Sequence, residues 1–157
     1  MRTVDSIHIA APPAEVFSLA ATVERWPEIL PHYRSVRFLE RRTGGGLVEM
    51  AARRPFGPVS YPAWWVSEMT VDQRRGEIRY RHVRGITAGM DVLWRVAAGN
   101  GEGGRDGGSD VSVVHEWAGP SWPLIGGLAA RLVIGPVFVH GIASRTLAGL
   151  KEALEKA

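Results

Sequence analysis

The sequence predicts an α+β fold in which a curved antiparallel sheet of about six or seven strands wraps around a long C-terminal helix. Most of the chain between residues 33 and 117 consists of short segments that alternate in polarity and are joined by short turns. Such connections favour antiparallel neighbours, because parallel strands need long crossovers. The last segment of the chain instead repeats its apolar residues at helical spacings of three and four.

The first part of the chain predicts one strand and two short helices. Residues 2–10 alternate loosely and are expected to form the strand. A short helix follows from Pro13, because proline suits a first helical turn and the apolar residues after it share one helical face. Residues 24–30 predict a second short helix that stops at Pro31.

Six further strands are expected to follow in a meander. The Gly44-Gly45-Gly46 run between the first two is typical of a hairpin turn. Residues 55–62 are rich in proline and glycine and predict a loop, and residues 100–109 predict a second, polar connection without the lysine of a phosphate-binding loop. The strands are predicted at residues 33–40, 47–53, 63–71, 76–83, 90–97 and 110–117.

Beyond Pro120 the pattern is helical again and stays so to the end. Pro136 suits the start of a helix, and apolar residues recur at helical spacing as far as Leu154. This helix is the only apolar element long enough to cover one face of the sheet. A strongly curved sheet that grips one helix tends to leave a space between them, and such spaces hold ligands.

Length and composition restrict the class of protein. The 157 residues suit one domain spanning 1–157, and 45% hydrophobic with 22% charged residues is ordinary for a globular chain. The lack of cysteine excludes disulfides, thiol catalysis and cysteine-ligated metals. The N-terminal residues do not have the pattern of a signal peptide, so a cytoplasmic location is expected.

Charge and hydropathy indicate neither a nucleic-acid partner nor a membrane span. The net charge is +3, but the basic residues are spread along the chain rather than clustered. Residues 124–143 are mostly apolar, yet they contain Arg131, His140 and several glycine and proline breaks. No metal or other cofactor is expected, because the five histidines show no short ligand spacing.

Strand alternation divides the side chains of the sheet into two faces. Charged residues gather on one of them, although Leu93 and Val114 fit that outward face poorly. The inward set is rich in tryptophan, which suits a flat apolar ligand held by stacking and one or two hydrogen bonds. The alternative is that the indoles simply fill the core. The inward set is Trp65, Ser67, Met69, Ile78, Tyr80, His82, Met90, Val92, Trp94, Val96, Val111, Val113, His115 and Trp117.

Two of the inward residues could transfer protons. His82 and His115 could act as acid and base, since an unperturbed imidazole titrates near pH 6.5 and serves either role. The alternative is that both are structural, hydrogen-bonded histidines. The sequence contains no nucleophile motif of the GxSxG form.

Several segments together resemble a known family. VERWPEILPHYRSVRFLER, AWWVSEMTVD, EIRYRHV, MDVLWRV and RTLAGLKEALE resemble the single-domain polyketide aromatase/cyclases, or polyketide cyclase/dehydrases, of the START-like helix-grip superfamily. The resemblance spans nearly the whole chain. It implies a deep pocket between sheet and terminal helix in which a poly-β-ketone is folded, cyclised and dehydrated. Positions that match the pocket lining of the family are Trp26, Tyr33, Trp65, Ser67, Met90 and Trp94.

The chain departs from that family at several inward positions. In ring-forming members the strand reads W-x-S-x-R with an inward arginine, whereas Met69 stands here and a thioether can neither donate a proton nor bear charge. His82 stands where members often carry another arginine, and His115 where they carry an amide. Val113 replaces a bulky aromatic residue, which would enlarge the pocket floor.

The sequence therefore leaves two hypotheses, both with an apolar small molecule as the partner. One is an aromatase/cyclase- or dehydratase-like enzyme, and the other is a non-catalytic carrier of a quinone or another lipid, favoured by Met69. A polyketide synthase or a membrane surface stays open as a further partner. Candidate catalytic residues are Tyr33, Ser67, Tyr80, His82 and His115, and predicted pocket residues are Trp26, Trp65, Met69, Met90, Trp94, Val113 and Trp117.

Overall fold

The backbone forms one curved antiparallel sheet with helices on its concave side. The computed structural model describes residues 1–56, 59–100, 108–119 and 139–156. The seven strands lie in the order β1-β7-β6-β5-β4-β3-β2. Their bounds are β1 Arg2–Ile9, β2 Tyr33–Arg42, β3 Gly45–Phe56, β4 Val59–Asp72, β5 Glu77–Gly85, β6 Asp91–Ala98 and β7 Ser109–Glu116. The helices are α1 Pro13–Ala21, the 3₁₀ helix η1 Val23–Arg25, α2 Trp26–Ile29 and α4 His140–Glu155.

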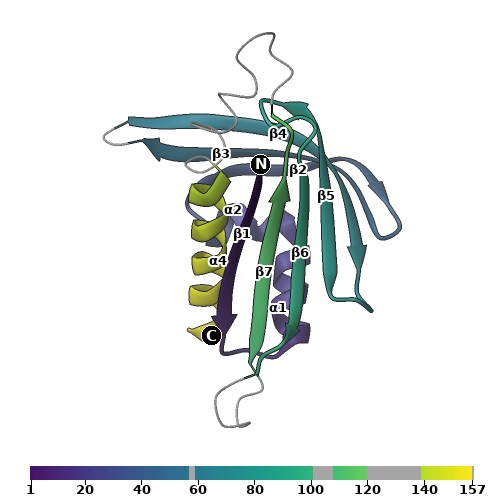
Figure 1. Ribbon diagram of the computed structural model, residues 1–157, viewed down its shortest axis with the longest axis vertical. Coiled ribbons are helices and arrows are strands. Elements are labelled where there is room, and N and C mark those ends of the chain that lie inside the picture. The colour runs from purple at the N-terminus through teal and green to yellow at the C-terminus, as the bar shows by residue number, and fades with distance from the viewer. Residues whose placement is uncertain (57–58, 101–107, 120–138, 157) are drawn as a thin grey trace.

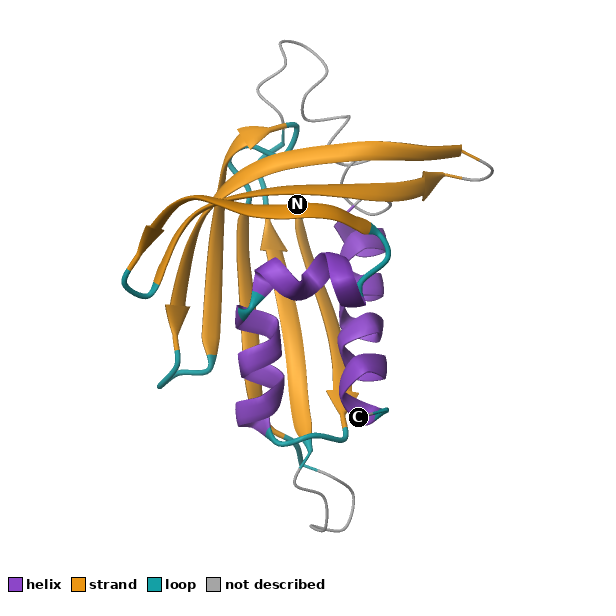
Figure 2. Cartoon of the chain, turned by 180° about the vertical axis from the view of Figure 1, so that it is seen from behind, coloured by secondary structure: helices purple, strands orange, loops and turns teal. Residues whose placement is uncertain are grey.

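The sheet bends so strongly that its two halves cross. In Figure 1 β2, β3 and β4 run across the ends of β1, β7 and β6. Figure 2 shows α1, α2 and α4 on the side of the sheet that this bend encloses. The arrangement confirms the predicted α+β fold, with short helices between the first two strands and a sheet around the C-terminal helix.

Helix α4 presents its apolar stripe to the interior. Ala143, Thr146, Leu147 and Leu150 are its buried residues and recur at spacings of three and four, so they share one helical face. Leu147 and Leu150 belong to the same hydrophobic core as residues from the sheet. The predicted helix start at Pro136 lies outside the described residues, as does most of the apolar segment before it.

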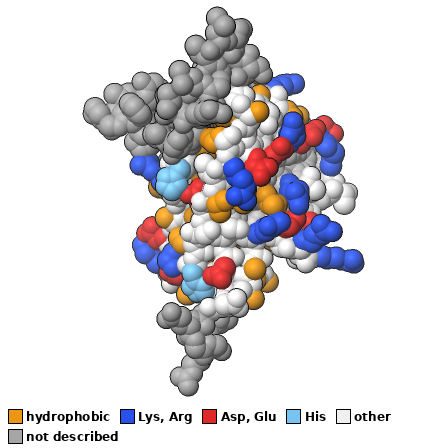
Figure 3. All heavy atoms as spheres, in the orientation of Figure 1, with side chains coloured by type: hydrophobic (Ala, Val, Ile, Leu, Met, Phe, Trp, Pro, Cys, Tyr) orange, Lys and Arg blue, Asp and Glu red, His pale blue; other side chains and the backbone are white. Residues whose placement is uncertain are grey.

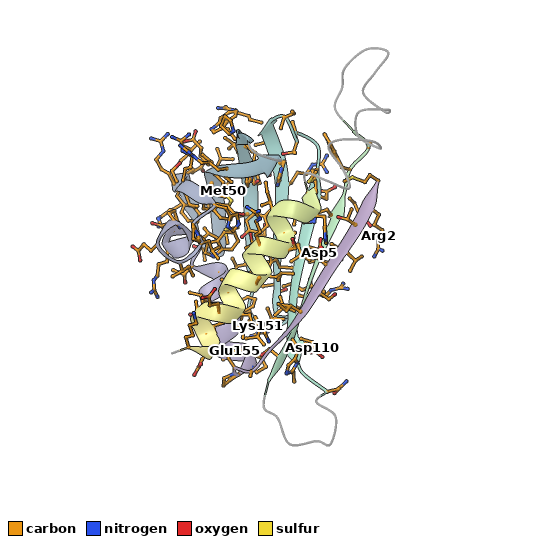
Figure 4. The ribbon with its side chains drawn as sticks, turned by 90° about the vertical axis from the view of Figure 1, so that its left-hand side faces the viewer. Arg2, Asp5, Met50, Asp110, Lys151 and Glu155 are labelled. Atoms are coloured by element: carbon orange, nitrogen blue, oxygen red, sulfur yellow. The ribbon has the colours of Figure 1, made fainter. Side chains whose placement is uncertain are left out.

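Polar contacts attach both ends of α4 to the first strand. At its start, His140 pairs through Nδ1 with the buried carboxylate of Asp5. Near its end, Lys151 Nζ donates to the carbonyl of His8 at 2.7 Å, and Glu155 accepts from the backbone N–H of Ala10 at 2.9 Å. Figure 4 shows Asp5 on the strand beside α4, with Lys151 and Glu155 further along the helix. The helix is therefore fixed along one edge of the sheet.

The predicted loop at residues 55–62 is wrong. The hairpin of β3 and β4 continues through this region, with Pro55 opposite Ser60 and Phe56 opposite Val59. The paired residues of β2 end at Ala52 of β3, and those of β5 end at Trp65 of β4, so the hairpin extends beyond both outer neighbours. Proline is tolerated there because the edge of the strand on which it lacks an N–H donor can face solvent, where no partner strand needs that hydrogen bond.

The predicted second helix at residues 24–30 consists of two shorter elements. Residues Val23–Arg25 form a 3₁₀ turn and Trp26–Ile29 form a single α-helical turn. Pro27 lies within the first turn of α2, where its missing N–H is not needed. The break leaves Trp26 buried against the core.

The predicted division of the sheet into two faces holds at most positions. All members of the inward set are buried except His115, which is partly buried. Val66 belongs to the outward face by strand alternation, since it lies between the inward residues Trp65 and Ser67, but it is 1% exposed. It lies beside a register irregularity between Val66 and Ser67, and its paired residues Glu49 and Arg84 have long side chains that can cover a valine.

The outer face carries the charges. Glu77 pairs with Arg79 at 2.9 Å and Arg95 at 3.2 Å, and Arg81 pairs with Asp91 at 2.6 Å. Figure 3 shows basic and acidic side chains interspersed over this face. The exposed Arg81–Asp91 pair contributes little stability. Glu77 is 9% exposed, so its carboxylate depends on the two arginines for compensation. Among the described helices, none combines the length and apolar character of a membrane-spanning helix.

Candidate functional site

A cavity lies between the concave face of the sheet and α4. Its floor and walls come from α2, from the six strands β2 to β7, from the turn between β5 and β6, and from the first turns of α4. Five aromatic side chains dominate the lining: Trp26, Tyr33, Trp65, Tyr80 and Trp94. The other lining residues are Met50, His82, Thr87, Met90, Val92, Val113, His115, Val139, Ile142, Ala143 and Thr146.

The free volume of this cavity is small. It measures about 70 Å³, whereas pockets that hold drug-sized ligands typically span roughly 300 to 1,000 Å³. Met50, which Figure 4 labels on β3, and Met90 both line it, and methionine side chains adapt easily to a changed shape. A ligand with several rings therefore needs lining side chains to move, while a single ring needs less displacement.

The cavity brings together most of the residues predicted from the sequence. Of the predicted pocket residues, Trp26, Trp65, Met90, Trp94 and Val113 line it. Four of the five candidate catalytic residues line it as well, namely Tyr33, Tyr80, His82 and His115. Their roles stay predictions.

Three predicted site residues lie elsewhere in the interior. Met69, Ser67 and Trp117 are buried but are not part of the cavity lining. Trp117 donates from Nε1 to the carbonyl of Ala88 at 3.1 Å, so its indole supports the turn between β5 and β6. Ser67 Oγ is buried and has no hydrogen-bond partner among the described residues.

Sequence reasoning missed several lining residues. Met50 follows the same strand alternation as its neighbour Trp65 and could have been found by that signal. Thr146 lies on the predicted apolar stripe of α4, where its hydroxyl donates to the carbonyl of Ile142 at 2.8 Å. Thr87 lies in a turn, where no periodic pattern reveals the direction of a side chain.

The aromatic side chains form one continuous wall. The ring centroids of Trp26 lie 5.1 Å from Tyr33 and 5.7 Å from Trp94. Tyr33 meets Trp65 edge-on at 6.2 Å, and Trp65 stacks on the imidazole of His82 at 5.8 Å with 6° between the planes. Offset and edge-to-face contacts of this kind are favourable beyond simple burial. They orient the rings before any ligand enters.

Burial keeps both imidazoles of the cavity neutral. It lowers the pKa of His82 to about 3, with a smaller contribution from the neighbouring His115. Burial also lowers the pKa of His115 to about 4. Since both values lie well below the ordinary 6.5, neither ring carries charge at neutral pH.

The two phenols of the cavity are also neutral. Burial raises the pKa of Tyr33 to about 12 and raises the pKa of Tyr80 further, so both keep their protons and can donate. The hydroxyl of Tyr80 and Nδ1 of His115 are buried without a hydrogen-bond partner among the described residues. Buried polar atoms are normally satisfied, so a water molecule or a ligand oxygen is expected at each.

The lining that the structure describes contains no lysine, arginine, aspartate or glutamate. Within the described ranges there is also no cluster of three side chains able to hold a metal ion. The cavity therefore offers stacking surfaces and neutral hydrogen-bonding groups. It can hold an uncharged ring compound with a few oxygen atoms.

Comparisons with known proteins agree with this chemistry. Residues 9–137 match the family described as polyketide cyclase / dehydrase and lipid transport. A 95-residue stretch is 33% identical to a Streptomyces cyaneus protein named "Putative polyketide cyclase". That match spans 59% of this chain and 60% of the relative, so the chain matches less than two thirds of that protein's length.

Solved structures show the same fold. The Zhui aromatase/cyclase from Streptomyces sp. R1128 superposes with a TM-score of 0.79 and 20% identity, over 99% of this chain and 94% of that one. A START superfamily protein from Mycobacterium smegmatis superposes with a TM-score of 0.72 and 12% identity, over 99% and 97% of the two chains. At these identities the likeness concerns the fold alone.

Proposed function

The chain belongs to the polyketide cyclase/dehydrase and lipid transport family, and from this premise we propose that it binds an uncharged, ring-containing compound of polyketide type and cyclises or dehydrates it. The site is the cavity between the sheet and α4. The observation that carries the proposal is the composition of the lining, in which an aromatic wall surrounds neutral donors and acceptors and no described residue is charged.

The aromatic wall favours a flat ligand. Tyr33, Trp65 and His82 contact one another in turn along the wall. A planar compound can therefore stack its apolar faces on these rings. A charged ligand would lose its hydration in the cavity and would meet no opposite charge among these residues. Burial of an unpaired charge costs much free energy. Poly-ketones and their aromatic products meet both requirements, because they are neutral, flat and rich in carbonyl oxygen.

The polar groups can supply acid and base chemistry without carrying charge. A neutral imidazole such as that of His115 can accept a proton from the carbon between two ketones. The enolate then attacks a second carbonyl, and a phenol such as that of Tyr33 or Tyr80 gives a proton to the new alkoxide. Loss of water from the resulting alcohol completes a cyclisation and dehydration, in which the imidazolium gives its proton to the departing hydroxyl and the phenolate takes the proton from the neighbouring carbon, so that both side chains return to their neutral forms. An imidazole with a pKa of about 4 is a weak base, which suits only an acidic C–H of this kind.

A second candidate function is a non-catalytic carrier of a quinone, a sterol-like lipid or a similar compound. It is favoured by Met69, which is buried at the position of the arginine of ring-forming members, and by the uncharged lining. The same cavity would serve, with the polar groups acting only in binding. A polyketide synthase or a membrane surface would then be the source or destination of the ligand.

Native mass spectrometry of the freshly purified protein tests ligand binding. We expect a retained neutral compound, released on denaturation and identified by its mass. Val113→Phe should abolish retention, because Val113 lines the small cavity and is buried. Val4→Phe is the matched control, because Val4 lies on the outer side of β1 and is 51% exposed. Equal retention by both variants would contradict binding in this cavity.

Turnover separates the two candidate functions. With a synthetic poly-β-ketone as substrate, an enzyme should lose at least about tenfold in kcat on His115→Ala, while the affinity for the aromatic product changes less. A carrier should show no turnover above the uncatalysed rate, and the variant should change affinity only. Circular dichroism and urea unfolding of each variant show whether it is folded.

A further inference from the structure

The turn between β5 and β6 folds back over His82. Its backbone is fixed by hydrogen bonds from Gly89 N to His82 O at 2.8 Å, from His82 N to Met90 O at 2.9 Å and from Met90 N to Thr87 O at 3.0 Å. The indole of Trp117 donates to the carbonyl of Ala88 in the same turn. These contacts bring Thr87, which is only 3% exposed, against the imidazole.

The hydroxyl of Thr87 lies 2.6 Å from Nδ1 of His82. Among the described residues, this is the only side-chain hydrogen bond of Thr87. If His82 carried its proton on Nδ1, that proton would point to the Thr87 oxygen, and the threonine's own proton would be buried without an acceptor. If Thr87 instead donates to Nδ1, the hydroxyl proton and Nδ1 are both satisfied, and the imidazole proton is on Nε2, where a water molecule or a ligand oxygen in the cavity can accept it. The second arrangement is favoured, because an unmet buried donor loses its hydration without compensation.

The second nitrogen of His82 is left for a ligand. The imidazole lines the cavity and its Nδ1 is occupied by Thr87, so Nε2 is the nitrogen available to a ligand. The parallel stacking on Trp65 fixes the plane of the ring and therefore the direction of the Nε2–H bond. His82 is thus held from two sides.

We propose that Thr87 is a positioning residue that holds His82 in the neutral Nε2–H form, so that His82 donates a hydrogen bond to a carbonyl oxygen of the ligand. The part that concerns the ligand rests on the proposed function. Tyr80 lies two residues earlier on the same face of β5, and its unpartnered hydroxyl supplies a second donor. Two donors on one strand select a ketone or quinone over a hydrocarbon of the same shape.

This assignment separates the roles of the two cavity histidines. With Nδ1 engaged by Thr87 and a proton on Nε2, His82 has no free lone pair and cannot act as a base. His115 keeps an unpartnered nitrogen, so the acceptor role falls to it. His82 instead donates a hydrogen bond that stabilises the negative charge developing on an enolate oxygen.

Long-range ¹H–¹⁵N NMR on histidine-labelled protein tests the tautomer without any ligand. The His82 signals are assigned by their loss in His82→Gln. We expect a protonated Nε2 and an unprotonated Nδ1 in the native protein, and a mixture of both tautomers in Thr87→Val. Thr87→Ser should restore the native pattern. Thr146→Val is the matched control, because that buried hydroxyl contacts His32 and not His82.

A proton on Nδ1 of His82 in the native protein would overturn the assignment, as would an unchanged pattern in folded Thr87→Val. Acetophenone and α-methylstyrene test carbonyl recognition, since they share a shape and differ in the C=O group. By NMR titration the ketone should bind roughly three- to tenfold more tightly, and Thr87→Val should narrow that ratio. Equal affinities would refute ketone recognition alone. Failure of both probes to bind would overturn the proposed function, while the tautomer measurement would stand.

Discussion

Met69→Arg is expected to lower the free energy of unfolding by about 3 to 5 kcal/mol, which is a large part of the stability of a domain of this size. Met69 is 4% exposed and lies in register between Gly46 of β3 and Tyr80 of β5. It does not line the cavity. An arginine there would bring a charge into apolar packing, where an uncompensated ion is expensive.

No described carboxylate is placed to compensate that charge. Only two acidic residues are buried among those described. Asp5 lies on β1, four strands away from β4 in the sheet order, and Glu77 is held on the outer face by Arg79 and Arg95. The hydroxyl of Tyr80 could accept one hydrogen bond but cannot satisfy a guanidinium with five donors.

Urea unfolding of three variants measures this effect. Met69→Leu conserves volume and should cost less than about 1.5 kcal/mol. Met69→Gln introduces polarity without charge and should lie between leucine and arginine. An arginine variant as stable as the leucine variant would show that position 69 reaches water or a partner, and would return it to the functional pocket. A gain of cyclisation in that variant would mean that Met69 alone silences a cyclase.

The alternation of strands was enough to predict which residues face inward, but not which of them meet the cavity. Trp65, Ser67 and Met69 share one face of β4, and all three are buried. Only Trp65 lines the cavity. The difference arises from the curvature of the sheet and the position of α4 over it. These depend on packing between elements distant in sequence, which a period of two does not encode.

Local sequence signals also failed where tertiary context changes their meaning. The prolines around residues 55–62 indicate a loop in isolation, yet they are tolerated in a hairpin that extends beyond its neighbouring strands. Thr87 has no periodic signal at all, because the turn brings it to His82 only after β5 and β6 have paired. The histidines were predicted as groups that titrate near neutral pH. Burial removes that property, and burial is known only once the fold is.

Acidification from pH 7 to pH 4.5 is expected to lower the free energy of unfolding by about 5 kcal/mol through His82 and His115 alone. In the unfolded chain both imidazoles take up a proton near pH 6.5. In the folded protein they stay neutral until the pH reaches about 3 for His82 and about 4 for His115. Between these limits the unfolded state binds more protons, so stability falls as the pH falls.

The magnitude follows from the size of that window. Each imidazole loses about 1.4 kcal/mol of stability for each pH unit below 6.5, until its folded-state pKa is reached. Two units therefore remove between about 2 and 3 kcal/mol per ring. Burial and Arg145 also lower the pKa of His32 to about 4, which adds a loss of the same sign. Above pH 7 these groups are neutral in both states, and their contribution is constant.

Urea unfolding at half-unit steps from pH 7.5 to pH 4.5 measures the slope of the free energy of unfolding against pH. In the folded protein the carboxylates of Glu77, Asp110, Glu152 and Glu155 keep their charge over this range, because ion pairs and hydrogen bonds lower their pKa values. In the unfolded chain carboxylates begin to take up protons near about pH 5, which adds a smaller loss of the same sign at the acid end. His82→Gln/His115→Gln should flatten most of the slope, whereas Val4→Gln, at an exposed position without a titratable group, should leave it intact. A double variant with the native slope would mean that both rings are hydrated in solution. A cavity that admits water in this way would offer a ligand much weaker hydrogen bonds than a dry one, so the acid profile also tests how the site binds.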